Sequence, residues 1–186
     1  MTEINNSRRK WLALGGIVLG GTLLPTELLA AVSTPKPRVM TFRNINTGER
    51  LTSALTNGKI SNTTDLKKLN HLLRDRRSQK VHRIDPRLFS KLYQIQGNLG
   101  LRNTEIQIIC GYRAPATNAA MSARSRGVAK NSYHMRGEAI DFRIDGVSLA
   151  NVRKAATRLN NGGVGYYPRS NFVHIDVGPN RTWRGS

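Results

Sequence analysis

Two segments near the carboxyl end alternate between polar and apolar residues, and this alternation constrains the fold more than any other feature. In residues 138–144, large apolar side chains occupy every second position, and Asp141 lies in the other set. Residues 172–177 repeat the pattern, with His174 and Asp176 in the polar set. Because successive side chains of a β-strand point to opposite faces, each segment predicts a strand with an apolar face toward a core and a polar face away from it.

Turn and helix patterns precede these strands. Residues 39–55 predict a hairpin around residues 46–49, because Asn and Gly favour tight turns. Leucines then recur at helical spacing within residues 66–73, with Thr64 and Asp65 as candidate caps. The sequence therefore predicts a hairpin followed by an amphipathic helix.

The middle of the chain carries further signals of regular structure. Asp85 followed by Pro86 is typical of a helix start, and Gly100 is typical of its end. Residues 105–110 predict a strand, and residues 148–160 predict another amphipathic helix. A chain of 186 residues can form one compact domain with a sizeable core but not two of ordinary size.

The charge balance restricts the class of partner. Thirty Lys and Arg residues oppose eleven Asp and Glu residues, which gives a formal net charge of +19. Such a surface attracts polyanions or carboxylate-rich surfaces, a description that fits both nucleic acid and the bacterial cell wall. The basic residues are scattered, and aromatic residues make up only 6% of the chain. This pattern favours general surface attraction over a base-reading site, so we expect no nucleic-acid partner.

The amino terminus has the order of a secretory signal. Two arginines at positions 8 and 9 precede an apolar stretch at residues 13–24, and Leu-Leu-Ala-Ala follows at residues 28–31, with the two small alanines at its end. The arginine pair beside Trp and Leu is similar to a twin-arginine (Tat) signal, although an Arg-Arg pair before a membrane anchor is the alternative. The apolar stretch is shorter than the roughly 20 residues of a bilayer span, so we expect cleavage near Ala30 or Ala31 and no permanent anchor. The mature chain, without three basic and two acidic residues, would keep a net charge of +18.

Three polar residues near the predicted strands have the chemistry of a metal site. His134 precedes the first strand, with Gly137 allowing a bend, while Asp141 and His174 lie on the polar strand faces. Two imidazoles and a carboxylate are ligands from which three-ligand catalytic zinc sites are built. The alternative is that each histidine is an ordinary hydrogen-bonded residue, which is our interpretation of His71 and His82, the other two histidines of the chain.

Cys110 is the only cysteine, so no intramolecular disulfide can form. It ends the apolar run of residues 106–110, which is typical of a buried thiol in a core. A role as a fourth zinc ligand is the alternative. The sequence leaves both open.

The residues around these candidates resemble a known family. The pattern Ser132-x-His134-x-x-Gly137-x-Ala139-x-Asp141, with Gly111-Tyr112-Arg113 upstream and a strand histidine downstream, resembles the M15-type zinc peptidases that cleave D-amino-acid bonds in peptidoglycan. Residues 124–130, 162–168 and 170–176 are similar to a group of murein endopeptidases in that family. The resemblance covers nearly the whole chain and implies an α+β fold, with a small antiparallel sheet carrying the zinc site and helices packed on one side.

The resemblance also implies roles for particular residues. It makes His134, Asp141 and His174 the ligands of Zn²⁺, and it makes Arg113 the arginine that grips the substrate near the scissile carbonyl. Some members of the family place a glutamate three residues before the last ligand, but Asn171 stands there in this chain. Asp176 is therefore a candidate general base, or alternatively a carboxylate that orients a metal-bound imidazole.

The expected function follows from the family resemblance and the predicted export. We expect a Tat-type signal peptide at residues 1–31, a linker and hairpin at 32–62, and a zinc peptidase domain at 63–186. The expected activity is hydrolysis of peptidoglycan cross-links in the periplasm, including diaminopimelate–diaminopimelate and D-Ala–diaminopimelate bonds. The alternatives are a D-Ala-D-Ala or L,D-carboxypeptidase, a non-catalytic zinc-containing wall-binding module, and a basic nucleic-acid-binding protein, which the signal disfavours.

Overall fold

The computed structural model describes residues 37–125 and 127–185, which form one eight-stranded sheet with helices. The predicted signal peptide at residues 1–31 lies outside this part of the chain. The strands lie in the order β3-β2-β1-β4-β5-β7-β6-β8. In chain order they are β1 Arg38–Asn44, β2 Arg50–Thr56, β3 Lys59–Ile60, β4 Ile106–Cys110, β5 Ala139–Ile144, β6 Gly163–Tyr167, β7 Phe172–Asp176 and β8 Arg181–Arg184.

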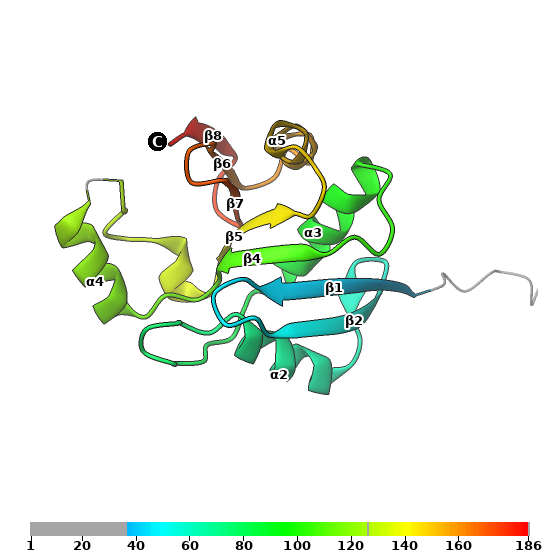
Figure 1. The fold of residues 1–186 in the computed structure, drawn as a ribbon, viewed down its shortest axis with the longest axis horizontal. Helices are drawn as coiled ribbons and strands as arrows, with labels where there is room; N and C mark the ends of the chain where they lie inside the picture. Colours follow the sequence, from blue (N-terminus) through cyan, green and yellow to red (C-terminus); the bar gives the residue numbers. More distant parts are fainter. Residues whose placement is uncertain (1–36, 126, 186) are drawn as a thin grey trace, which may run out of the picture. The chain divides into compact units, whose positions relative to one another are not determined.

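The sheet is mostly antiparallel, and the predicted α+β class is confirmed. Two neighbouring pairs, β1 with β4 and β6 with β8, are parallel. The helices are α2 Thr63–Leu72, α3 Pro86–Asn98, α4 Pro115–Arg124 and α5 Leu149–Thr157, with a 3₁₀ helix η1 at Tyr133–Arg136. Helices α2, α3 and α5 contribute to the core with the sheet, whereas α4 lies to one side of the strands (Figure 1).

The local signals explain where several elements begin. The predicted hairpin is β1 and β2, and it belongs to the same sheet as β5 and β7. Asp85 caps α3 by accepting a hydrogen bond from the Arg87 backbone N–H at 2.9 Å, with Pro86 in the first turn. The cap of α2 was predicted wrongly. Asn62, not Thr64 or Asp65, accepts the hydrogen bond of the first turn, at 2.8 Å.

One apolar cluster fills the space between the sheet and the helices. Ile140 and Phe142 of β5 and Val173 and Ile175 of β7 are at most 1% exposed and belong to this cluster. Burying each of these side chains stabilises the fold by roughly 1.5–3 kcal/mol. The predicted alternation is therefore confirmed, since the intervening residues, Asp141 and the rest of the polar set, are not part of the cluster.

Among the described residues, 37–125 and 127–185, no helix has both the length and the apolar content that crossing a bilayer requires.

Candidate metal centre

A row of five residues crosses the sheet on the face opposite the apolar cluster. Cys110 of β4 pairs with Asp141 of β5, and Asp141 pairs with His174 of β7. His174 in turn pairs with Gly165 of β6, and Gly165 with Trp183 of β8. Because directly paired residues point to the same face of a sheet, strand register brings together side chains that are far apart in the sequence.

Asp141 is at the centre of the predicted ligand set. Its Oδ1 lies 3.2 Å from Nε2 of His134 and 2.7 Å from Nδ1 of His174. Ligands about 2.1 Å from a tetrahedral zinc lie about 3.4 Å apart, close to the first distance, while the second is that of a direct hydrogen bond. All three side chains are buried. The described structure thus brings the three predicted ligands together, and their nitrogen and oxygen donors suit a metal ion such as zinc.

The helix η1 positions His134. Ser132 caps η1 by accepting a hydrogen bond from the His134 backbone N–H at 3.3 Å, and Gly137 ends it with a φ of 69°. Nδ1 of His134 lies 2.7 Å from the backbone oxygen of Gly111, which can only accept a hydrogen bond. Nδ1 must therefore carry the proton of the neutral ring, and Nε2, the atom facing Asp141, presents its lone pair.

His174 is oriented in the opposite sense. Its Nε2 lies 3.1 Å from Oδ2 of Asp176, and its Nδ1 faces Asp141. A proton on Nε2 is favoured by the Asp176 carboxylate, which leaves Nδ1 as the atom available to a metal. A carboxylate behind a metal-bound imidazole is a common arrangement, because it sets the tautomer and the ring orientation.

Asp176 is fully buried, and both its oxygens are occupied. Oδ1 accepts hydrogen bonds from the backbone N–H groups of Gly163 and Gly178 at 2.9 Å each and from Arg181 at 3.1 Å. Oδ2 accepts from Arg181 at 2.6 Å and faces His174. Burial alone would raise the pKa of Asp176, but the hydrogen bonds from His174, Arg181 and the two glycines hold it well below its usual range.

Asp141 and His134 shift each other's pKa. Burial alone would raise the pKa of Asp141, but His134 and His174 beside it hold that pKa well below its usual range. Burial alone would lower the pKa of His134, but Asp141 and the Cys110 thiol raise it well above its usual value. In the absence of metal, these groups behave as a buried ion pair.

The other two histidines, His71 and His82, lie outside this site. His71 lies near Glu49, and His82 stacks on Tyr112.

Gly165 makes room for Trp183 beside His174. A Cβ on Gly165 would lie 2.6 Å from the Trp183 ring. With no side chain there, the Trp183 ring lies 5.2 Å from the His174 ring, centroid to centroid, and its N–H donates to the Tyr167 hydroxyl at 2.9 Å. Gly165 and Trp183 are not among the site residues predicted from the sequence, because only strand pairing places them next to His174.

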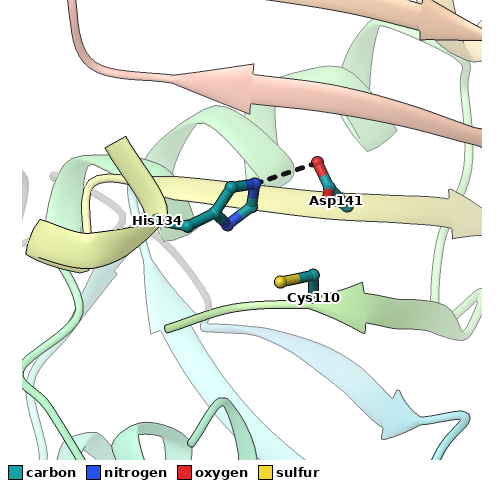
Figure 2. Close-up of side chains that lie close together, drawn as sticks. All are labelled: Cys110, His134 and Asp141. Carbon is teal, nitrogen blue, oxygen red and sulfur yellow. Dashed lines mark ion pairs between the residues drawn. The ribbon is translucent and has the colours of Figure 1, made fainter. Parts of the chain in front are cut away.

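Cys110 lies beside two of the candidate metal ligands and not in the core. Its sulfur, a nitrogen of His134 and a carboxylate oxygen of Asp141 all lie within 4.8 Å of one another, and the residue is half-buried (Figure 2). The pairing of β4 with β5 shifts register between Ile108 and Cys110, which leaves Ile109 unpaired. This irregularity moves Cys110 off the face that Ile106 and Ile108 share. Cys110 therefore does not lie in the core, where the apolar run would predict it.

Arg113 lies on the wall of the same cleft. Its guanidinium donates to Oδ1 of Asn118 at 3.3 Å and to Sγ of Cys110 at 3.5 Å. Asn118 is 2% exposed and also donates to the backbone oxygens of Ala129 and Lys130, so it ties α4 to the loop before η1. Asn118 cannot be identified from the sequence, since a single Asn in a helix has no local signature of this contact.

The cleft that contains these groups has a volume of about 840 Å³ and is strongly basic. Of the arginines that the structure describes, six line it: Arg74, Arg76, Arg77, Arg113, Arg181 and Arg184. Among the described residues of its lining, only Asp75 and Asp141 carry carboxylates. Asp75 accepts hydrogen bonds from the backbone N–H groups of Arg77, Ser78 and Ala114. The cleft therefore suits an anionic ligand, and Asp176 is not part of its lining.

Comparison with known proteins identifies the family. Residues 32–183 match the family model described as peptidoglycan L,D-endopeptidase MepK. A Haemophilus influenzae protein named as a probable peptidoglycan L,D-endopeptidase MepK is 60% identical over 185 residues, which cover 100% of both chains. The peptidoglycan L,D-endopeptidase MepK of Escherichia coli K12 is 52% identical over 183 residues, 98% of this chain and 100% of that protein. The chain therefore belongs to this family of M15-type peptidases, and it is a peptidase that hydrolyses peptidoglycan.

Proposed function

We propose that the chain is a zinc-dependent murein endopeptidase that hydrolyses peptide cross-links of peptidoglycan, including diaminopimelate–diaminopimelate and D-Ala–diaminopimelate bonds. The observation that carries the proposal is the meeting of His134, Asp141 and His174 on one face of the sheet, inside a basic cleft. The names of the relatives, which describe peptidoglycan endopeptidases, support the substrate class.

His134 through Nε2, Asp141 through Oδ1 and His174 through Nδ1 would hold the ion. The backbone oxygen of Gly111 and the carboxylate of Asp176 fix the tautomers that leave these nitrogens free. When bound, zinc supplies Lewis acidity, which polarises a carbonyl and makes a water molecule a better nucleophile near neutral pH.

Arg113 would bind the carbonyl oxygen of the scissile bond and stabilise the negative charge that develops there. Its guanidinium is charged at any physiological pH and lies on the cleft wall, held by Asn118. A donor held in advance costs little reorganisation during the reaction, which is why such groups contribute strongly to catalysis.

Asp176 would orient His174. A general base needs a free lone pair within reach of the reacting water. Five hydrogen bonds from four residues surround the Asp176 carboxylate, and the residue does not line the cleft. Of the two roles that the sequence leaves open, the orienting role agrees with these contacts.

The substrate and the compartment belong to the same proposal. Peptidoglycan stem peptides carry free carboxylates, and the six arginines of the cleft would attract them. The twin-arginine pattern at residues 8 and 9 supports export to the periplasm by the Tat pathway, where this substrate lies.

Digestion of purified sacculi tests the proposal. The native protein, the chelator-treated protein and the variant His134→Ala would be incubated with sacculi, and the released muropeptides would be separated and identified. We expect the native protein to convert cross-linked dimers to monomers, and the other two preparations to be inactive. His71→Ala serves as a control, because His71 lies outside the cleft. Release of terminal D-Ala with dimers left intact would instead show a carboxypeptidase.

A further inference from the structure

The proposed role of Arg113 depends on the short segment that carries it, residues 111–114 between β4 and α4. This segment contacts His134 twice. The backbone oxygen of Gly111 lies 2.7 Å from Nδ1 of His134, and the backbone N–H of Arg113 donates to the backbone oxygen of His134 at 3.1 Å. These contacts hold the backbone of Arg113 next to one of the candidate metal ligands.

A second set of contacts reaches the same segment from the residues that follow α2. The backbone N–H of Tyr112 donates to the backbone oxygen of Leu73 at 2.8 Å. The backbone N–H of Ala114 donates to Oδ2 of Asp75 at 2.6 Å. The side chain of Asp75 therefore holds the residue that comes directly after Arg113.

The carboxylate of Asp75 is 2% exposed, and both its oxygens accept hydrogen bonds. Oδ1 accepts from the backbone N–H groups of Arg77 at 2.7 Å and Ser78 at 3.1 Å, while Oδ2 accepts from Ala114. Burial alone would raise the pKa of Asp75, but hydrogen bonds from the Thr117 side chain and from these three N–H groups hold that pKa below its usual value. The buried carboxylate is thus charged, and it joins the loop after α2 to the start of α4.

Helix α4 has no cap of its own at this end. Its N-cap residue is Ala114, which makes no side-chain cap hydrogen bond. Asp is among the residues that most often cap helices, and a negative charge is favoured at a helix N-terminus. Asp75 supplies such a carboxylate from another segment. On the first turn of α4, Oδ1 of Asn118 accepts a hydrogen bond from the Arg113 guanidinium at 3.3 Å.

We propose that Asp75 is the positioning residue of Arg113. It anchors the backbone directly after Arg113, and it anchors the start of α4, from which Asn118 holds the guanidinium. The inference rests on the proposed function, in which Arg113 binds the scissile carbonyl. A charge-stabilising donor is most effective when it is held in place in advance, and a displacement of about 1 Å can lower the rate on the order of 100-fold.

The variant Asp75→Asn tests the inference. Asparagine has nearly the same size but one acceptor oxygen, so either the Ala114 N–H or the N–H groups of Arg77 and Ser78 lose their partner. We expect kcat on purified cross-linked muropeptide dimers to fall by about 10- to 100-fold. Zinc affinity, measured by chelator competition, should stay unchanged. The control Asp85→Asn removes the same charge from the cap of α3, outside the cleft lining, and should leave kcat unchanged.

A double-mutant cycle distinguishes positioning from general structural support. Arg113→Ala alone should lower kcat, and Asp75→Asn added to it should lower kcat no further, because the group that Asp75 positions is already absent. If Asp75→Asn does not fold, as thermal unfolding would show, Asp75→Glu replaces it in the same cycle. Glutamate keeps the charge and both acceptor oxygens, but it is one methylene longer and shifts the segment.

The outcomes separate this inference from the proposed function. An Asp75 variant with native kcat, or losses that multiply in the double variant, would overturn the inference and leave the endopeptidase proposal intact. An Arg113→Ala variant with native kcat would overturn the inference together with the proposed role of Arg113. A native protein that leaves the dimers intact would contradict the endopeptidase proposal and, with it, the inference.

Discussion

The carboxylate of Asp176 shows how single contacts decide between two chemical roles. It is fully buried, and it receives two backbone N–H groups, the Arg181 guanidinium and the His174 imidazole. A carboxylate offers about four lone-pair sites, and these partners occupy them. We therefore propose that Asp176 acts through His174, whose orientation and tautomer its carboxylate favours.

The variant Asp176→Asn measures this role. It keeps the size of the side chain but removes its negative charge. The amide NH₂ group replaces one carboxylate oxygen and cannot accept the hydrogen bonds that this oxygen now receives. We expect zinc affinity to fall by about 10- to 100-fold and the free energy of unfolding to fall by roughly 2–4 kcal/mol. Chelator competition and denaturant unfolding give the two values. A general base would show the opposite pattern, with kcat reduced and zinc affinity unchanged.

The raised pKa of His134 predicts a pH dependence of metal binding. The metal needs the lone pair of Nε2, but in the metal-free protein the charge of Asp141 keeps a proton on His134. Zinc affinity should therefore decrease as pH falls below this pKa, by up to about tenfold per pH unit. Competition titrations between about pH 5 and pH 8 would show it. A flat profile would contradict the ion pair between His134 and Asp141.

The same pKa has the opposite consequence for the stability of the metal-free fold. A histidine whose pKa is raised by folding stabilises the protein below its unfolded pKa of about 6.5. That contribution is lost as pH rises through the folded pKa. Protonation of His134 at low pH thus stabilises the metal-free fold, while the same protonation weakens metal binding.

At the scale of elements, the 3₁₀ helix η1 depends on its last position. Gly137 has a φ of 69°, and a Cβ there would lie 2.2 Å from the backbone oxygen of Arg83. This close approach holds η1 against the segment before α3, where the Asp85 N–H also donates to the Gly137 oxygen at 2.9 Å. The position of His134 therefore depends on packing outside the cleft.

Gly137→Ala should destabilise the fold by roughly 2–5 kcal/mol, from the left-handed backbone and the backbone clash together. Gly146→Ala is a matched control, because Gly146 has the same φ of 69° but nothing within 4 Å of its would-be Cβ. We expect that control to lose about 1 kcal/mol. Denaturant unfolding compares the two, and equal losses would mean that the contact with Arg83 contributes nothing.

Strand β4 shows where local pattern and tertiary structure differ. Its apolar run predicts a strand, and a strand is present at Ile106–Cys110. The run by itself also places Cys110 with the core residues, because alternation is counted from the sequence alone. The unpaired Ile109 shifts the alternation by one residue, and nothing in the run of apolar residues indicates this shift. Bulges depend on how neighbouring strands pair, so a single segment does not reveal them.

At the scale of the whole molecule, charge is concentrated where the proposed substrate would bind. The chain has a net charge of +19, and six of the arginines in the described part of the chain line one cleft. Arg76 and Arg77 have no carboxylate within ion-pair distance among the described residues. They are available to an anionic ligand, whereas Arg74 and Arg181 already pair with Glu49 and Asp176.

The double variant Arg76→Gln, Arg77→Gln should raise KM for a cross-linked muropeptide several-fold and change kcat little, because these groups attract the substrate without touching the reacting bond. The control Lys154→Gln, Arg158→Gln removes the same charge from the end of α5, outside the cleft. It should leave KM unchanged. Steady-state kinetics on purified cross-linked muropeptide dimers would give KM and kcat for both double variants. Equal changes in KM would mean that net charge alone is responsible.

The sequence by itself determined the features that depend on neighbouring residues: the α3 cap at Asp85, the alternation of β5 and β7, the turn at Gly137, and which residue types could bind a metal. These follow from backbone geometry over a few residues, so they can be predicted without knowing the fold. The family pattern added which His and Asp residues belong together.

Only the tertiary structure decided the features that depend on register between strands. Pairing of β4, β5, β7, β6 and β8 aligns Cys110, Asp141, His174, Gly165 and Trp183 in one row. Asp176 is buried, and its carboxylate accepts hydrogen bonds from Gly163, Gly178 and Arg181, so that no oxygen is free. The physical reason is that register and burial are set by packing across the whole sheet, and a shift of one residue reverses the face to which every side chain points.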